Sequence, residues 1–170
     1  KKTLARTWAI PGTKGLEHRI GGLEKEDGTG NVSYDPANHH AMTIKRQEKV
    51  NKVADFIPNL EVFGSKSGKL LVIGWGGTYG SLYSAVDSLL KEGESIALCQ
   101  FNYINPLPIN ISTILSKYKK IVVCELNSGQ FANYLRMNFE GVIFNQYNKI
   151  QGFPFTTSEL ESHFKTLLTN

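Results

Sequence analysis

Short apolar runs alternate with helical patterns from Lys69 onward, and this alternation most constrains what the chain can fold into. The runs read "KLLVIGW", "SIALCQFN", "IVVCELN" and "GVIFNQY". A strand without polar alternation is typical of a parallel sheet, in which both faces are covered. Because such strands alternate with helices, the sequence predicts an α/β domain of three layers, with a mainly parallel sheet and helices on both faces.

Four segments between and after these runs have the spacing of helices that bury one face. The first ends at Gly93, which suits a left-handed C-cap, and the last begins with a capping box from Thr156 to Glu159. The second begins after two prolines. The apolar faces that we expect are Leu82, Ala85, Val86 and Leu89; Ile111, Ile114, Leu115 and Tyr118; Phe131, Leu135 and Phe139; and Leu160, Phe164 and Leu167.

The first third of the chain lacks this alternation. Residues 1–34 hold six of the sixteen glycines with no clear period, which favours irregular chain lying on a surface. Asp35 is a good N-cap and Pro36 suits the first helical position, so a helix should begin there and run to about Ile57. Its apolar stripe is narrow and its other side is basic.

The turn-rich stretch "FGSKSG" separates this helix from the first apolar run. We therefore expect an α/β domain over residues 68–170. Residues 1–67 are expected to form a linker segment plus a helix that would pack on a neighbouring domain outside this sequence, because so long an irregular segment is unusual within one compact domain. The absence of an initial Met suggests a piece cut from a longer polypeptide.

Charge, cysteine content and the length of the apolar stretches argue against several classes of protein. Of the net charge of +4, residues 1–55 carry +3, from ten Lys/Arg and seven Asp/Glu, and no Arg-rich stretch is interleaved with aromatic residues, so nothing favours nucleic-acid binding. No apolar stretch approaches the roughly 20 residues of a membrane span. Cys99 and Cys124 lie in apolar runs, which favours free thiols in a reducing cytoplasm over a disulfide framework. An iron–sulfur cluster needs about four thiolates, more than this chain has.

Four glycines between residues 74 and 80 spell G-x-G-G-x-x-G between a strand and a helix, and two interpretations remain open. In the first, Gly76, Gly77 and Thr78 bind the phosphate of a cofactor at the helix N-terminus. Three features argue against a dinucleotide: the next strand ends in "CQFN" without a carboxylate, Trp75 places a large ring in the turn, and no Lys-Ser/Thr pair follows. In the second, the turn only lets helix and strand pack closely.

Polar residues follow the third apolar run, in "VVCELNSGQ". Glu125, Asn127 and Gln130 should lie at the carboxyl edge of the sheet, where open α/β folds bind ligands and partners. They are therefore candidate interface residues. The alternative is that Glu125 is solvated or ion-paired and that Asn127 caps a helix.

The histidines do not have the spacing of a metal site. His39 and His40 are adjacent, whereas metal sites on helices prefer an i, i+4 spacing, so we expect polar surface there and no metal site. His18 lies in a glycine-flanked loop, and His163 is expected to be exposed on the last helix. No spacing supports a catalytic triad or a carboxylate pair, so no catalytic residue is assigned.

Several motifs, in order along nearly the whole chain, resemble a known family. "RTWAIPGTKGLEH" contains the G-x-E-H element Gly15–His18, and "DPANHHAMTIKRQEKV" contains the basic pattern from Met42 to Lys49. "GWGGTYG", "NPLP", "VCELNSGQFANYLR" and "GFPF" follow. Together they resemble the C-terminal region of 2-oxoacid:ferredoxin oxidoreductase alpha subunits, of the 2-oxoglutarate synthase type, including a domain similar to the C-terminal domain of transketolase.

The resemblance implies an enzyme that oxidatively decarboxylates a 2-oxoacid to an acyl-CoA and passes the electrons to ferredoxin. It implies thiamine diphosphate, magnesium, an iron–sulfur cluster and coenzyme A in the whole enzyme, held by the rest of the alpha subunit and by a beta subunit. This chain would then be a structural fragment, inactive alone. Two other functions stay open: a nucleotide- or coenzyme A-binding module that uses the glycine turn, and a dimerisation unit that forms a homodimer.

Overall fold

The chain folds into two compact units, Lys1–Ile57 and Pro58–Asn170, in a computed structural model that describes residues 4–5, 7–18 and 21–169. The division lies before Pro58, whereas the sequence suggested a boundary at residues 67 and 68. The stretch "FGSKSG", expected to be a linker turn, adds a short strand to the second unit because Phe63 and Gly64 pair with Leu98 and Ala97. Each unit is described by itself below.

A five-stranded sheet organises the described part of the second unit, in the order β1-β3-β2-β4-β5. Its strands are β1 (Phe63–Gly64), β2 (Gly68–Trp75), β3 (Ile96–Phe101), β4 (Tyr118–Glu125) and β5 (Phe144–Asn148). All neighbouring strands are parallel except β1, which is antiparallel to β3. The mainly parallel sheet inferred from the apolar runs is therefore confirmed, with β2 at its centre.

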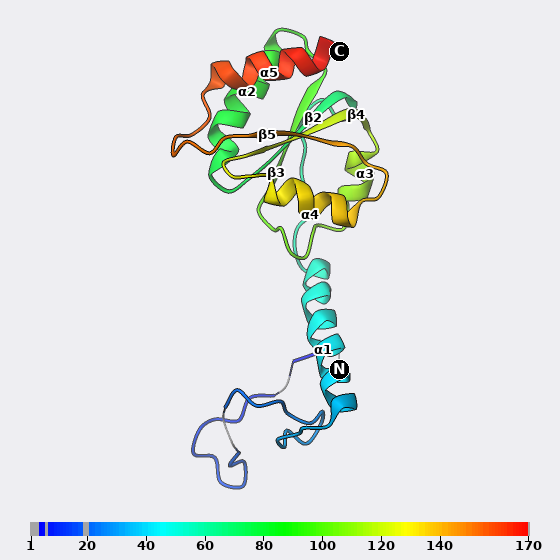
Figure 1. The fold of residues 1–170 in the computed structure, drawn as a ribbon, viewed down its shortest axis with the longest axis vertical. Coiled ribbons are helices and arrows are strands. Elements are labelled where there is room, and N and C mark those ends of the chain that lie inside the picture. The colour runs from blue at the N-terminus through cyan, green and yellow to red at the C-terminus, as the bar shows by residue number, and fades with distance from the viewer. Residues whose placement is uncertain (1–3, 6, 19–20, 170) are drawn as a thin grey trace. The chain divides into compact units, whose positions relative to one another are not determined.

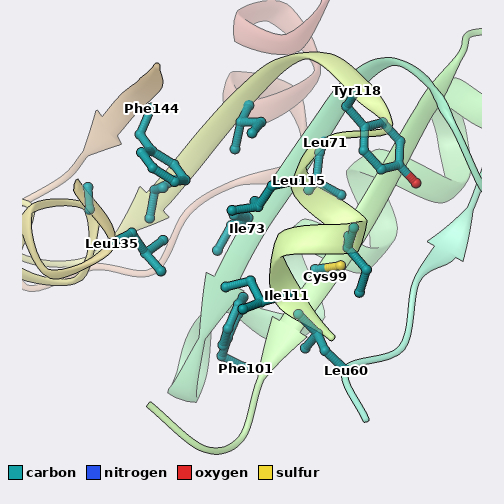
Figure 2. Packing of buried hydrophobic residues seen from close by; sticks show 14 of the residues in the cluster. Leu60, Leu71, Ile73, Cys99, Phe101, Ile111, Leu115, Tyr118, Leu135 and Phe144 are labelled. Atoms are coloured by element: carbon teal, nitrogen blue, oxygen red, sulfur yellow. The ribbon is translucent and has the colours of Figure 1, made fainter. Parts of the chain in front are cut away.

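Helices cover both faces of this sheet, as predicted (Figure 1). On one face, α2 (Tyr79–Lys91) and α5 (Thr157–Thr169) pack over a buried cluster that includes Leu70, Val72 and Phe164. On the other face, α3 (Ile111–Leu115) and α4 (Gln130–Asn138) cover a second cluster that includes Leu71 and Ile73. Figure 2 shows this second cluster, with side chains from β2, β3, α3 and α4 pointing toward one another.

The ends of the helices follow the capping signals of the sequence. Gly93 has a φ of +89°, and its N–H donates to the carbonyl of Leu90, so it terminates α2 as expected. The hydroxyl of Thr156 accepts from the N–H of Glu159 at the start of α5. All four residues of the predicted apolar face of α2 are fully buried.

Three local expectations for the second unit were wrong, and in the first unit the α-helix expected to run to about Ile57 ends at Asn51. The helix after the prolines ends at Leu115, and Tyr118 opens β4 because its backbone pairs with Gly68 and its hydroxyl donates to the carbonyl of Ser65 at 2.6 Å. In α5 the fully inward position is Leu168, while Leu167 is only partly buried. His163 is half-buried instead of exposed, because its ring stacks on Tyr147 with 4.3 Å between ring centroids.

The first unit contains α1 (Pro36–Asn51) and a 3-10 turn, η1 (Lys52–Asp55), after an irregular segment. Asp35 caps α1 by accepting from the N–H of Asn38 at 2.8 Å, as predicted. None of the described residues before Pro58 is buried. Side-chain contacts instead connect the irregular segment to α1: the ion pairs Glu24–Arg46 at 2.8 Å and Asp27–Lys45 at 2.5 Å, and the contact of the Glu24 carboxylate with the His39 ring at 2.6 Å.

These pairs predict how the first unit responds to acid. The Arg46 guanidinium, and after it the His39 ring, lower the pKa of Glu24 from its ordinary 4.5 to about 2. A lowered pKa means that the pairing contributes fully above about pH 4.5 and is lost as the pH falls toward 2. In an NMR titration of the Glu24 side-chain carboxyl, we expect Arg46→Gln to raise the midpoint toward 4.5 and Lys49→Gln to leave it unchanged. A midpoint near 4.5 in the unsubstituted chain would contradict the pairing.

Candidate functional site

The glycine turn links β2 to α2 at the carboxyl edge of the sheet. Gly76 to Thr78 form a single 3-10 turn, η2, and Gly76 has a φ of +57°, a conformation that favours glycine. Gly76 and Gly77 are exposed, and a Cβ added to either would meet no atom within 4 Å. Their backbone is therefore open to an approaching ligand. Thr78, by contrast, is buried, and its hydroxyl bonds the N–H and carbonyl of Trp75 at 3.2 and 2.9 Å.

Gly74, one residue before the end of β2, serves the packing of helix on strand. A Cβ there would lie 2.2 Å from Cδ1 of Leu82 and 2.8 Å from the hydroxyl of Thr78. A side chain at this position would require the side chains of Leu82, Gln100 and Thr78 to shift. The packing interpretation thus accounts for Gly74 but does not require a glycine at Gly77. Phosphate binding at Gly76, Gly77 and Thr78 stays a prediction.

A groove of about 740 Å³ lies beside the turn. Its lining includes Gly76, Tyr79, Gln100 and Asn102, together with the chain from Pro58 to Phe63. Gln100 stands on β3 and donates from Nε2 to the carbonyl of Gly76 at 3.1 Å, so it stabilises the turn. Of the three candidate cofactor-binding residues, the groove includes Gly76 and leaves out Gly77 and Thr78.

Glu125, at the end of β4, is fully buried. Its carboxylate accepts from the N–H groups of Phe131 and Ala132 in the first turn of α4, both at 2.9 Å, and from the indole N–H of Trp75 at 3.3 Å. Backbone N–H groups at a helix N-terminus lack partners within the helix and favour an anion. This carboxylate therefore fixes α4 and orients the Trp75 ring inward, toward Phe131.

The two other candidate interface residues differ in their surroundings. The side-chain oxygen of Asn127 accepts from the N–H groups of Gly129, the N-cap residue of α4, and of Gln130, its first residue, at 2.7 and 3.2 Å. Asn127 therefore binds the backbone at the start of α4 without being its N-cap residue. Gln130 is exposed, and its side chain makes no hydrogen bond within the described part of the chain. Whether these residues form an interface stays a prediction.

The thiols and histidines do not assemble into a site. Burial raises the pKa of Cys99 to about 12, and burial, with a smaller effect of Glu125, also raises the pKa of Cys124, so both thiols stay protonated. Cys99 belongs to the cluster under α3 and α4, and Cys124 to the cluster on the opposite face. Among residues 4–5, 7–18 and 21–169, no three His, Cys, Asp or Glu side chains lie close enough to hold a metal ion.

Nor is any helix in those ranges long and apolar enough to cross a membrane.

Sequence reasoning did not foresee the contact between Trp75 and Glu125, nor the bond from Gln100 to the turn. The sequence contains a signal for the position of Glu125, because this carboxylate ends a buried strand a few residues before a glycine and the start of a helix. The free N–H groups at that helix N-terminus need acceptors. The sequence predicts that the Trp75 ring occupies the turn, whereas in the structure the ring is partly buried and packs against the core.

Comparison with known proteins gives a consistent result, although no family model matches. The 2-oxoglutarate oxidoreductase subunit KorA of Mycobacterium tuberculosis is 40% identical over 169 residues, covering 99% of this chain and 25% of that protein. The 2-oxoacid:ferredoxin oxidoreductase 2, subunit alpha, of Aeropyrum pernix is 27% identical over 154 residues, covering 88% and 24%. The solved 2-oxoglutarate:ferredoxin oxidoreductase from Magnetococcus marinus, with 2-oxoglutarate, coenzyme A and succinyl-CoA bound, has a TM-score of 0.90 at 30% identity, covering 99% and 30%. The chain thus spans about a quarter of the length of these curated relatives.

The role of Glu125 predicts a loss of stability when its charge is removed. In Glu125→Gln a single amide oxygen replaces two acceptors, and the NH₂ group faces a backbone N–H. Hydrogen bonds to charged groups contribute about 1.5–3 kcal/mol, so we expect the free energy of unfolding in urea to fall by about 2–3 kcal/mol. Glu140→Gln, an exposed control, should change it by less than about 0.5 kcal/mol. Equal effects of the two substitutions would contradict the assigned role.

Proposed function

We propose that this chain, which is homologous to part of the alpha subunits of 2-oxoacid:ferredoxin oxidoreductases, is a scaffold domain of such an enzyme. The observation that carries the proposal is the match of 99% of the chain, at 40% sequence identity in one relative and a TM-score of 0.90 in another. The family resemblance drawn from the sequence motifs is thereby confirmed, and so is the α/β fold.

The substrate of the whole enzyme is proposed to be a 2-oxoacid, most closely 2-oxoglutarate, which is oxidatively decarboxylated to an acyl-CoA with ferredoxin as electron acceptor. The relatives' names support this assignment, because two of the three specify 2-oxoglutarate. The rest of the alpha subunit and a beta subunit are the proposed partners, in the cytoplasm.

The side chains of this chain do not fit the metal cofactors of that reaction. Its two thiols lie in different core layers and stay protonated, so they do not suit an iron–sulfur cluster, and the buried carboxylate of Glu125 is engaged by α4 and Trp75. We therefore propose that the cluster lies in another part of the enzyme, and the family resemblance implies the same for thiamine diphosphate and magnesium. The role that we propose for this chain is structural: it forms a rigid sheet and provides surfaces that contact other parts of the enzyme.

The first unit supports an assembly role. Of the linker segment and helix expected over residues 1–67, the part up to Ile57 is proposed to pack on a neighbouring domain, since large apolar side chains among its described residues are accessible. Trp8, Tyr34 and Phe56 are each more than 80% exposed, which is costly unless another surface covers them.

The direct test is an assay of 2-oxoglutarate-dependent viologen reduction with coenzyme A, thiamine diphosphate and Mg²⁺. We expect no turnover from the 170-residue chain, and turnover from the complete alpha and beta subunits as the positive control. Turnover by the isolated chain would overturn its assignment as a scaffold. Failure of the complete enzyme to oxidise any 2-oxoacid would overturn the proposed reaction.

A second candidate function is contact with coenzyme A at the glycine turn, favoured by the groove beside Gly76 and by the coenzyme A in the Magnetococcus marinus structure. In this case calorimetry should give a Kd below about 100 μM for coenzyme A, tighter than for NAD. Gly77→Val fills open space next to the turn and should weaken binding at least tenfold, whereas the matched control Gly21→Val should not. Equal affinity of the two variants would exclude the turn as the contact.

A further inference from the structure

The opposite, amino edge of the sheet has a cleft that the proposed function does not use. Its volume is about 420 Å³, and it lies where β2, β3 and β4 begin. The polar side chains that line it are Ser67, Lys69, Ser95, Ser116, Lys117 and Lys119. No carboxylate is among the lining residues. Since β2 rises about 3.3 Å per residue over eight residues, the cleft lies on the order of 20 Å from the glycine turn.

The three lysines of the cleft differ from the other lysines of the same unit. Of eight lysines between Pro58 and Thr169, five have a hydrogen-bond or ion-pair partner: Lys66 with Val62, Lys91 with Asp87, Lys120 with Leu167, Lys149 with Glu159, and Lys165 with Glu92. Lys69, Lys117 and Lys119 have no side-chain partner in the described part of the chain. The unit's unpaired ammonium groups are therefore gathered at one cleft.

Hydroxyl groups accompany these charges. Ser95 Oγ accepts from the N–H of Lys69 at 3.2 Å, which leaves its own O–H free to donate. Gly68 allows this approach, because a Cβ at Gly68 would lie 2.1 Å from Ser95 Oγ. The side chain of Ser67 has no hydrogen bond among the described residues. The cleft thus offers donors and positive charge with no acceptor side chain of opposite charge.

We propose that this cleft binds a phosphate group of a small molecule. A phosphate carries up to two negative charges and three acceptor oxygens, and charge-assisted hydrogen bonds to ammonium groups are the stronger kind. Three like charges around one cleft repel one another, and a bound dianion removes this repulsion. A single carboxylate offers one charge and fewer acceptors, so it matches three lysines and a serine less well. Citrate carries about as much charge as pyrophosphate but divides it among three carboxylates separated by a carbon skeleton, so comparing the two tests for the phosphate group and not for charge alone.

A structural role for the lysines is the competing explanation. Lys117 follows the end of α3 closely, and cations near helix C-termini are favourable. On this explanation, substituting the lysines lowers stability and leaves anion binding unaffected. On ours, it abolishes binding and leaves the fold intact, because all three lysines are exposed.

Calorimetry of the 170-residue chain in about 100 mM salt separates the two explanations, with pyrophosphate, inorganic phosphate and citrate as probes. We expect saturable pyrophosphate binding with a submillimolar Kd, weaker binding of phosphate, and citrate binding at least tenfold weaker than pyrophosphate. The double substitution Lys117→Gln/Lys119→Gln should weaken pyrophosphate binding at least tenfold. Lys49→Gln/Lys52→Gln removes the same charge from α1 and η1, and should leave the Kd within twofold.

An independent measurement does not depend on how the variants fold. In amide NMR spectra of the unsubstituted chain, pyrophosphate should shift the signals of Gly68, Lys69, Ser95 and Lys117 first. The proposal is overturned if no saturable binding occurs below about 10 mM, if the two double variants lose affinity equally, if citrate binds as tightly as pyrophosphate, or if the first shifts lie elsewhere.

Discussion

The second unit depends on the complete burial of β2. Leu70, Leu71, Val72 and Ile73 are successive residues with no exposed surface, so both faces of the strand must be covered at once. Each side chain of this kind contributes about 1.5–3 kcal/mol when fully buried, and losing either helical layer would expose two of the four. The parallel sheet, the two helical layers and the tight return from β2 to α2 all follow from this requirement. At Gly74 the packing is tight, because an added Cβ would lie within 3 Å of side-chain atoms of Leu82, Gln100 and Thr78.

Burial patterns made the sheet and its helices predictable from sequence, whereas the contacts at the carboxyl edge were not. Apolar runs and helical spacing report which faces are covered, so β2 to β5 and the faces of α2 and α4 could be inferred. The prediction that Tyr118 belongs to a helix was wrong, because an apolar residue at helical spacing also suits the start of a strand. Only its pairing with Gly68 distinguishes the two structures. Phe63 and Gly64 resembled a turn for a similar reason: a two-residue strand has no periodicity.

At the candidate site, too, local contacts could be inferred from the sequence and contacts between distant residues could not. A carboxylate at the end of a strand predicted a polar position, and Glu125 is polar in a buried setting that depends on Trp75, fifty residues earlier in the chain. Asn127 needed no distant partner, since its hydrogen bonds at the start of α4 are to residues two and three positions later. The lysines at the amino edge come from β2, β4 and the turn before β4, so their proximity follows from strand order, which the sequence does not encode locally.

The first unit contrasts with this self-sufficient sheet. Its described residues bury no side chain and are connected by charge pairs on α1, which are worth little where they are exposed to solvent. We propose that another part of the protein supplies a surface on which this unit is ordered, and the relatives, about four times as long, contain further chain for that role. Hydrogen exchange tests it directly, by comparing the 170-residue chain with the complete alpha and beta subunits. We expect the amides of β2 to β5 to be protected from exchange in both samples. The amides of residues 7–18 and 21–57 should gain protection only in the complete enzyme. Equal protection of those residues in both samples would contradict it.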